Sequence, residues 1–380
     1  MPEEPRRPGI LQVLPAMVAG GVPLGTIEVA RATVAAGWRA VVASAGGPGV
    51  EALETAGAKH VTLPLASKNP VVMWRNAADL VTVIANERID IVHARSRAPA
   101  WSAAAAARRT ECRLVTTFHG TYGHANALKR RYNAVMTRGD AVIAISEHIA
   151  RHMETVYATP RDRITVIHRG VDPARLDPAR IDPARVAALR QKWGVAEGVA
   201  VVLLPGRVTR WKGHTVLIDA IARLERRDLV CLLVGDIQGR RGFGAELGAQ
   251  IARHGLSDVV KTVGGCDDMA SAYALADIVV SASTDPEAFG RVAIEAQAMG
   301  KPIIATAHGG AAETVIDGET GWLVAPGDAA ALSDALSHLW DTAAARARFG
   351  EAGIAHVAAH FTTEKMCAAT LALYRSLLTA

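Results

Sequence analysis

Short apolar runs alternate with helical segments along the first 160 residues. Apolar runs of strand length occur at 10–16, 41–44, 61–65, 90–93, 114–118 and 141–146. Between them, apolar residues recur with helical spacing at 26–36, 80–86, 100–109 and 147–157, and Gly20 and Gly21 separate the first strand from the first helix. Strands that alternate with helices of this length predict a parallel sheet with right-handed crossovers.

The alternation stops at a proline-rich boundary and then begins again. Residues 171–185 contain Asp-Pro-Ala-Arg three times. A proline inside a helix removes a hydrogen bond and clashes with the preceding turn, so one continuous helix is excluded here. We expect a connection of turns, followed by strands at 199–205, 230–235, 259–263, 278–281 and 302–306, and by helices at 186–193, 214–225, 245–254, 290–299, 329–340 and 364–378.

This order of elements predicts two doubly wound, Rossmann-like α/β domains. We expect an N-terminal domain at 1–175, a second domain at 176–360, and a C-terminal helix at 361–380 that packs back on the first domain. In such folds ligands bind at the carboxyl ends of the strands, so we expect a site in a cleft between the domains.

The composition agrees with two globular domains. The chain has 380 residues, of which 50% are hydrophobic and 21% charged, and no apolar run approaches the roughly 20 residues of a membrane span. Arg6 and Arg7 before the apolar run resemble the start of a secretory signal peptide. Glu3 and Glu4 are acidic residues where such a signal has a basic segment, so we expect a cytoplasmic protein. The four cysteines lie far apart without a Cys-x-x-Cys pair, which favours free thiols and no metal site.

Positive charge is concentrated in the first half. Residues 1–170 hold 21 Lys and Arg against 13 Asp and Glu, whereas residues 171–380 hold 21 against 24. An anionic membrane surface or a phosphorylated acceptor would suit the basic half, and a solvated helix face is the simpler alternative. Lys129, Arg130 and Arg131 are followed at helical spacing by Val135 and Met136, which predicts an exposed amphipathic patch. Only 4% of the residues are aromatic and no recognition motif is present, so nucleic acid is not expected.

Two glycine-containing loops follow strands and precede helices. The first spans 20–25 and would bring backbone N–H groups to an anion, although a plain tight turn explains it equally well. In the second, Arg207 and Lys212 follow the first strand of the second domain. Two cations at that place suit a diphosphate, and the alternative is a pair of exposed surface cations.

Two glutamates flank the expected start of the helix at 290–299. Free N–H groups at a helix start near Gly290 favour phosphate. Glu287 precedes the helix and Glu295 lies in its second turn, where each carboxylate can accept hydrogen bonds from neighbouring sugar hydroxyls. The alternatives are a helix-capping acid for Glu287 and a surface residue for Glu295.

Together these motifs resemble the retaining glycosyltransferases of family 4, which have the GT-B fold. The likeness covers nearly the whole chain and is carried by Glu287-x7-Glu295 with Phe289-Gly290 inside it, Gly206-Arg207 with Lys212-Gly213, and the runs at 166–172, 277–283 and 318–324. The run at 92–97 is similar to members that build bacterial lipopolysaccharide, and its Arg95 and Arg97 would face an acidic acceptor or solvent. The family more often has Pro-Asn-Gly where this chain has His168-Arg169-Gly170, and a small or apolar residue where it has Arg291.

The resemblance implies a role for each matching residue. Arg207 and Lys212 would clamp the donor diphosphate, Glu295 would bind the ribose hydroxyls, and Glu287 would contact the transferred sugar. The same likeness implies that Gly21 lies close to the diphosphate and that His119 faces the donor sugar, with a core histidine as the alternative. Backbone amides for the sugar and the phosphate would come from Phe289, Gly290 and Arg291.

The expected activity is therefore transfer of a hexose from a UDP- or GDP-linked sugar to a cell-envelope glycan or glycolipid such as lipopolysaccharide. The resemblance implies retention at the anomeric carbon, and the absence of an Asp-x-Asp sequence suits departure of the nucleotide without a metal or another cofactor. The alternatives are a nucleotide-sugar epimerase, a sugar phosphorylase and a non-catalytic nucleotide-sugar-binding protein. An epimerase needs no acceptor, a phosphorylase requires inorganic phosphate, and a binding protein releases no nucleoside diphosphate.

Overall fold

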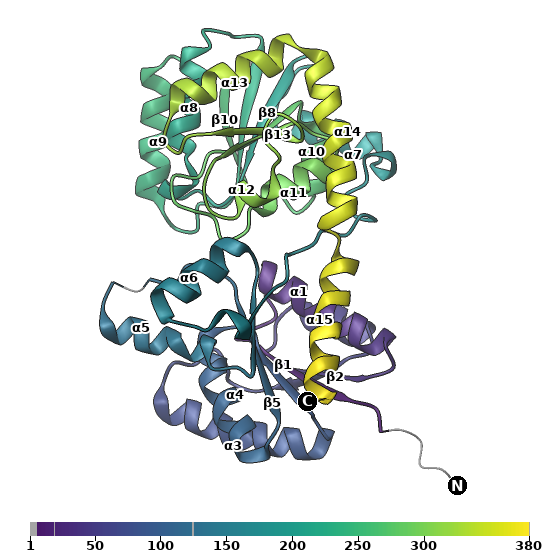
Figure 1. The fold of residues 1–380 in the computed structure, drawn as a ribbon. Coiled ribbons are helices and arrows are strands. Elements are labelled where there is room, and N and C mark those ends of the chain that lie inside the picture. Colours follow the sequence, from purple (N-terminus) through teal and green to yellow (C-terminus); the bar gives the residue numbers. More distant parts are fainter. Residues whose placement is uncertain (1–5, 19, 124, 380) are drawn as a thin grey trace. The chain divides into compact units, whose positions relative to one another are not determined.

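The computed structural model describes residues 6–18, 20–123 and 125–379, so Glu3 and Glu4 lie outside the described residues. The chain forms two compact units (Figure 1). Unit 1 comprises Met1–Arg169 and Glu364–Ala380, and unit 2 comprises Gly170–Thr363. We describe each unit by itself.

Unit 1 is built on a parallel seven-stranded sheet of order β3-β2-β1-β4-β5-β6-β7. The strand order reverses between β1 and β4, and such a switch point is where open α/β sheets bind ligands. The strands are β1 (Gly9–Val13), β2 (Arg39–Ser44), β3 (Lys59–Thr62), β4 (Ile91–Ala94), β5 (Arg113–Phe118), β6 (Ala141–Ala144) and β7 (Ile164–Val166).

Helices cover both faces of this sheet. They are α1 (Gly21–Ala35), α2 (Gly49–Thr55), α3 (Pro70–Glu87), α4 (Arg97–Thr110), α5 (Ala127–Asn133), α6 (Glu147–Tyr157) and the C-terminal α15 (Thr363–Thr379), with 3-10 turns η1 (Ala134–Thr137) and η2 (Arg161–Arg163). Helix α15 joins the core of unit 1, because Leu371 and Tyr374 pack in one apolar cluster with Ile10, Ile91 and Ile143.

Unit 2 repeats the plan with a parallel six-stranded sheet of order β10-β9-β8-β11-β12-β13, reversing between β8 and β11. Its strands are β8 (Ala200–Pro205), β9 (Leu229–Val234), β10 (Val260–Gly264), β11 (Ile278–Ser281), β12 (Ile303–Thr306) and β13 (Gly321–Val324). Its helices are α7 (Pro183–Lys192), α8 (His214–Arg223), α9 (Arg241–Arg253), α10 (Met269–Leu275), α11 (Arg291–Ala298), α12 (Ala311–Thr314), α13 (Ala329–Asp341) and α14 (Ala343–His360), with 3-10 turns η3 (Pro178–Arg180) and η4 (Arg210–Lys212).

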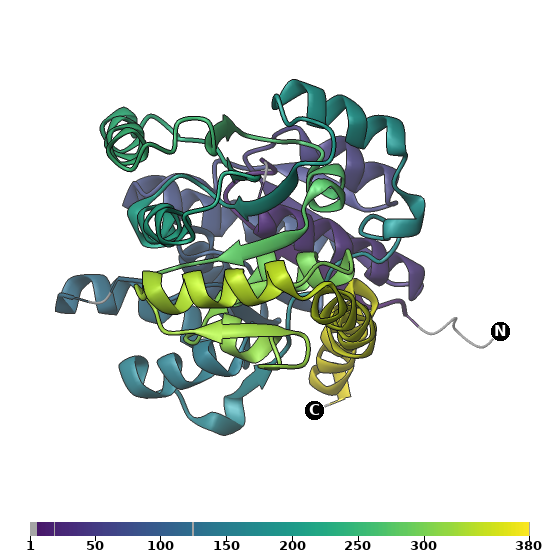
Figure 2. The same cartoon turned by 90° about the horizontal axis from the view of Figure 1, so that it is seen from above.

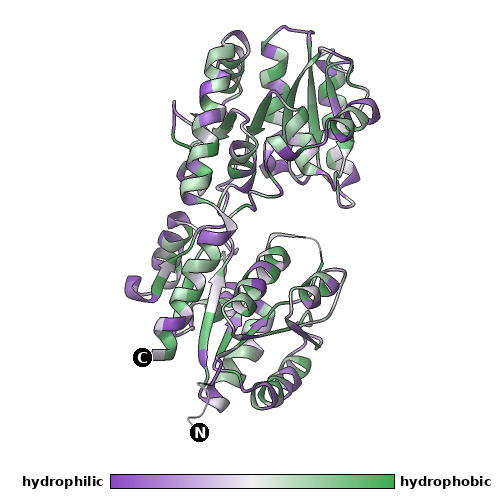
Figure 3. Cartoon of the chain, turned by 90° about the vertical axis from the view of Figure 1, so that its right-hand side faces the viewer, coloured by the Kyte–Doolittle hydropathy of each residue, from purple (hydrophilic) through white to green (hydrophobic). Residues whose placement is uncertain are grey.

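Two apolar clusters fill the two faces of the second sheet. On one face, Leu332 and Leu336 of α13 pack with Leu217 of α8, and Figure 2 shows α13 lying along that face. On the other face, Leu189 of α7 and Ala293 of α11 pack over the same strands. The strands are accordingly the most hydrophobic segments of this unit (Figure 3). Strands buried on both faces read as continuous apolar runs, which is why the sequence indicated them clearly.

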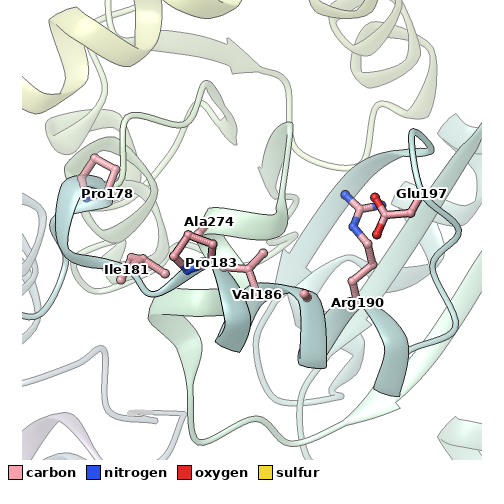
Figure 4. Close-up of a pocket in the computed structure, with 8 residues that line it drawn as sticks. Pro178, Ile181, Pro183, Val186, Arg190, Glu197 and Ala274 are labelled. Carbon is pink, nitrogen blue, oxygen red and sulfur yellow. The ribbon is translucent and has the colours of Figure 1, made fainter.

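The Asp-Pro-Ala-Arg repeats form three similar turns, as the sequence predicted. Asp172, Asp177 and Asp182 each accept a hydrogen bond from the backbone N–H two residues later, at 2.9 Å in every case. The third turn starts a helix, because Asp182 caps α7 and Pro183 takes a first-turn position where no N–H is needed. The prolines border a shallow surface pocket with Arg190 and Glu197 at its other end (Figure 4).

Two features of the described residues differ from what the sequence predicted. The first repeat belongs to unit 2, because Val171 forms a parallel bridge with Thr362. The prediction of an exposed amphipathic patch was wrong in its apolar part: α5 ends at Asn133, and Val135 and Met136 are fully buried in η1. Among the described residues, no helix is long and apolar enough to cross a membrane.

Candidate active site

Two loops of unit 2 meet where the second sheet reverses its strand order. Strands β8 and β11 are hydrogen-bonded neighbours, so the segments that follow them leave the same edge of the sheet. The segment after β8 carries Arg207 and Lys212, and the segment after β11 carries Glu287. The sheet topology thus brings together residues 75 positions apart in the sequence.

Lys212 and Glu287 form a buried ion pair in this loop cluster. The Lys212 Nζ lies 2.7 Å from Glu287 Oε1, and the two side chains are 13% and 11% exposed. Ser283 donates a hydrogen bond to the same oxygen at 2.6 Å, and Ser281 at 3.4 Å. Burial acts to raise the pKa of Glu287, but the Lys212 charge and these hydrogen bonds outweigh it and lower that pKa below its ordinary value. Glu287 is therefore an ionised carboxylate in a nearly dry site, and it does not cap the helix.

Glu295 is held from two sides on the adjoining helix. Tyr273, on α10, donates its hydroxyl to Oε2 at 2.8 Å, and Arg291 donates to Oε1 from Nε at 3.0 Å and from Nη2 at 2.7 Å. Burial and the neighbouring Glu295 carboxylate raise the pKa of Tyr273 well above its ordinary value, so its hydroxyl stays a proton donor. The Glu295 side chain is only 18% exposed, which excludes the alternative of an ordinary surface residue.

The start of α11 lies between the two carboxylates. Gly290 is the N-cap residue and has φ of 88°, a left-handed conformation that other residues adopt with strain. An added Cβ there would also lie 2.9 Å from the backbone of Ala311. Phe289 is 3% exposed and packs edge-on against Phe361. These contacts fix the chain as it enters α11, whose first N–H groups lack partners within the helix.

Arg207 does not join this cluster. Its side chain is exposed and, among the residues that the structure describes, has no hydrogen-bond or ion-pair partner. Lys212 differs in being buried and in lying 4.6 Å from the Trp211 ring centre. The structure thus joins Lys212 to Glu287 and Arg291 to Glu295, and leaves Arg207 on the surface.

In unit 1, the predicted residues Gly21 and His119 are linked by one arginine. Arg169 donates one hydrogen bond to the carbonyl oxygen of Gly21 and another to His119 Nδ1 at 3.4 Å. Burial, followed by the charges of Arg169 and Arg95, holds the pKa of His119 well below its ordinary value, so the imidazole is neutral. Gly21 is the first residue of α1, directly after the loop that follows β1.

Arg95 lies in the same region and is 4% exposed, which excludes its facing solvent. It follows β4 and donates to Gln12 of the neighbouring β1 at 2.8 Å. His93, two residues earlier, is also buried, between the Tyr374 and Thr117 hydroxyls. Arg97 points elsewhere, donating to Asn133 at 3.1 Å and lying 4.2 Å from the Tyr122 ring centre.

The sequence did not identify four residues that the structure brings to these clusters. Ser281 and Ser283 lie in the run after β11 that carried the family likeness, so their position was a usable signal. Tyr273 and Gln12 carry no local signal, because their partners are far away in the sequence. Among the described residues, no group of three or more His, Cys, Asp or Glu is arranged to hold a metal ion.

Both units match known families of glycosyltransferases. Residues 19–175 match the model described as Glycosyltransferase Family 4, and residues 186–356 match the model described as Glycosyl transferases group 1. Among curated proteins, D-inositol 3-phosphate glycosyltransferase 2 of Catenulispora acidiphila is 36% identical over 251 residues, which cover 63% of this chain and 57% of that protein. The chain thus spans little more than half the length of this relative.

Solved structures match over the full chain. A glycosyltransferase from Rickettsia africae has 39% identity and a TM-score of 0.90, covering 98% of this chain and 99% of its own. HepE from Anabaena, solved in complex with UDP, has 27% identity and a TM-score of 0.84, covering 97% and 100%. The predicted family and fold are confirmed: the chain belongs to the family 4-type glycosyltransferases of the GT-B fold.

Proposed function

We propose that this chain transfers a hexose from a UDP-linked sugar to an anionic acceptor, with retention at the anomeric carbon and without a metal. The observation that carries the proposal is the buried cluster at the switch point of the second sheet, where Lys212, Glu287 and Glu295 adjoin the start of α11. HepE from Anabaena has been solved with UDP and with UDP-glucose, which supports UDP over GDP.

The charges of this cluster suit a departing nucleoside diphosphate. When the glycosidic bond breaks, negative charge grows on the diphosphate, and a preorganised cation in a desolvated site stabilises it. The Lys212 ammonium has three N–H donors, so it can keep Glu287 and still bind a phosphate oxygen. Backbone N–H groups at the start of α11 would add to this, and Arg207 would close on the diphosphate from the surface.

The carboxylates retain capacity for sugar hydroxyls. Glu295 accepts three hydrogen bonds from Tyr273 and Arg291, and an ionised carboxylate offers about four lone-pair positions. One position thus remains for a ribose hydroxyl. Glu287 Oε2 accepts no hydrogen bond from the described residues, which leaves it for the transferred sugar. We propose same-face displacement rather than a covalent intermediate, because the motifs of the sequence offer no nucleophile for the opposite face of the sugar.

The identity of the acceptor is proposed from the names of the relatives and from the charge of the first half of the chain. The curated relatives are named D-inositol 3-phosphate glycosyltransferases, so a phosphorylated polyol stands beside the envelope glycolipid that the sequence led us to expect. Both are anionic and suit the positive balance of residues 1–170. Lipopolysaccharide as acceptor and an anionic membrane surface as partner stay predictions. Helix α5 keeps an exposed basic face with Leu128, which is 82% exposed, for such a surface.

The test is release of UDP from UDP-hexoses in the presence and absence of candidate acceptors. The proposal predicts acceptor-dependent release of UDP and a product with the donor's anomeric configuration by NMR. Conversion of the sugar without an acceptor would identify an epimerase, and dependence on inorganic phosphate a phosphorylase. Binding of UDP without turnover across a broad acceptor panel would favour the non-catalytic alternative.

A further inference from the structure

A small pocket in unit 1 collects positive charge at the switch point of the first sheet. Arg95, Arg169 and His119 line it, together with His93, two threonines and apolar side chains. Its cavity volume is about 20 Å³. Pockets that bury a whole drug-sized ligand measure roughly 300–1,000 Å³, so this much smaller pocket suits one small chemical group at the end of a larger ligand.

Two guanidinium groups share this pocket at close range. A Cβ added at Gly25 would lie 2.9 Å from Nη2 of Arg169 and 3.1 Å from Nη2 of Arg95. The two nitrogens are therefore at most about 6 Å apart, and like charges at that distance repel unless an anion lies near both. Glycine at position 25 is what leaves room for both side chains beside α1.

Unpartnered donors lie beside these charges. Arg95 is 4% exposed, yet its Nε has no hydrogen-bond partner among the described residues. His119 Nε2 is likewise buried without a partner among them. Because His119 is neutral and its Nδ1 accepts from Arg169, its proton belongs on Nε2, which is then a donor. A buried donor without a hydrogen-bond partner destabilises the protein, and a bound acceptor group removes that cost.

The described residues that line the pocket carry positive but no negative charge. Of the pocket-lining residues that the structure describes, none is Asp or Glu. The carboxylate whose charge acts on Arg95 is Glu28, on α1 and outside the lining. Two arginines arranged around one space match the geometry and charge of a phosphate better than those of a neutral sugar.

We propose that the pocket formed by Arg95, Arg169 and His119 binds the phosphate group of a phosphorylated acceptor. This inference rests on the proposed function, because it assigns the diphosphate of the donor to unit 2. It names the acceptor class, a phosphate monoester, and the residues that recognise it. The rest of the acceptor would extend through the mouth of the pocket.

The test is calorimetric titration of inorganic phosphate into the full chain, with chloride at matched ionic strength as reference. We choose Gly25→Ala as the main variant, because alanine favours a helix interior while its methyl group displaces both guanidiniums. Gly248→Ala in α9 is the matched control, since a Cβ there meets nothing within 4 Å. Arg169→Gln and Arg95→Met test the charges, with circular dichroism to verify folding.

The expected result is phosphate binding that weakens at least about tenfold in Gly25→Ala and Arg169→Gln and is unchanged in Gly248→Ala. Saturating UDP should leave phosphate binding intact, and displacement of phosphate by UDP would overturn the inference by identifying a donor site. Equal phosphate affinity in wild type and in folded pocket variants would overturn it as well. Binding of UDP without binding of phosphate defeats this inference alone, whereas binding of phosphate without binding of UDP supports it and counts against the proposed function.

Discussion

The carboxyl edges of the two sheets carry similar cations in opposite electrostatic settings. In unit 2, Lys212 and Arg291 are each paired with a carboxylate, at 2.7 Å in both cases. In unit 1, Arg95 donates to the neutral amide of Gln12, and its Nε has no partner among the described residues. A carboxylate that is held by a cation can orient the hydroxyl groups of a ligand. A buried cation that donates to a neutral amide favours the binding of an anion. The same fold thus provides cations paired with carboxylates in one unit and a buried arginine that donates to a neutral amide in the other.

The largest expected effect comes from removing the paired cation of unit 2. Lys212→Ala should lower kcat/KM for transfer by at least about a hundredfold, or roughly 2.7 kcal/mol, because both the diphosphate contact and the partner of Glu287 are lost. Steady-state kinetics of UDP release measures it. Arg210→Ala is the control, because Arg210 lies in the same 3-10 turn in an exposed ion pair with Glu246. Near-normal kcat/KM in a folded Lys212→Ala variant would remove Lys212 from the mechanism.

Both regions also contain a histidine kept neutral, and the one in unit 2 gives a pH prediction. Burial, reinforced by the charge of nearby Lys212, lowers the pKa of His214, the first residue of α8, to about 4. Below pH 6.5, the ordinary pKa of histidine, His214 binds a proton in the unfolded chain but not in the folded chain. The free energy of unfolding therefore decreases as the pH falls from 6.5 towards 4.

This histidine should therefore cost roughly 2 kcal/mol of unfolding free energy between pH 7 and 5. Urea unfolding at the two pH values measures the loss. His214→Gln should reduce the pH-dependent loss by about that amount, whereas His254→Gln, at a half-exposed histidine paired with Asp219, should not. An unchanged pH dependence in His214→Gln would show that this imidazole is charged in the folded chain.

A smaller effect is expected from the tyrosine that orients Glu295. Tyr273→Phe removes one hydrogen bond to a carboxylate, worth about 1.5 kcal/mol, and should raise the Kd for UDP roughly tenfold. The measurement is calorimetric titration of UDP, with kcat at saturating donor as a second readout that should change little. A Kd equal to that of wild type would mean that Arg291 alone positions Glu295.

No effect is expected from removal of divalent metals. In the proposed function, Lys212 and the start of α11 would supply the positive charge that a metal otherwise provides, so UDP release should persist in excess EDTA. Loss of activity with EDTA and its recovery with Mg²⁺ or Mn²⁺ would contradict this part of the proposal.

Local patterns predicted most of the fold, and they missed elements whose local pattern is weak. Buried parallel strands such as β11 are continuous apolar runs, and α6 was predicted with its observed ends, 147–157. Helix α14 was missed because its alanine-rich sequence shows little periodicity around Phe349 and Val357. The short β7 was missed because three residues carry too weak a pattern.

Motifs predicted some residues of the candidate site, whereas their contacts depend on the tertiary structure. Glu287, Glu295 and Lys212 were predicted from motif spacing, because each lies near a strand end or within the first turns of a helix that the sequence reveals. Their mutual pairing was not foreseen, since it depends on the adjacency of β8 and β11. Arg95 was left between an acidic acceptor and solvent, because only tertiary packing shows that the residue after a buried strand is itself buried.

Titration of UDP into the wild-type chain and into Lys212→Ala and Arg210→Ala tests whether the diphosphate of the nucleotide binds at Lys212 in unit 2. The account predicts that UDP binds the wild type and Arg210→Ala with equal affinity and binds Lys212→Ala at least about tenfold more weakly, because only Lys212 belongs to the buried pair with Glu287. Equal affinity for all three folded chains would contradict the assignment of the nucleotide diphosphate to unit 2.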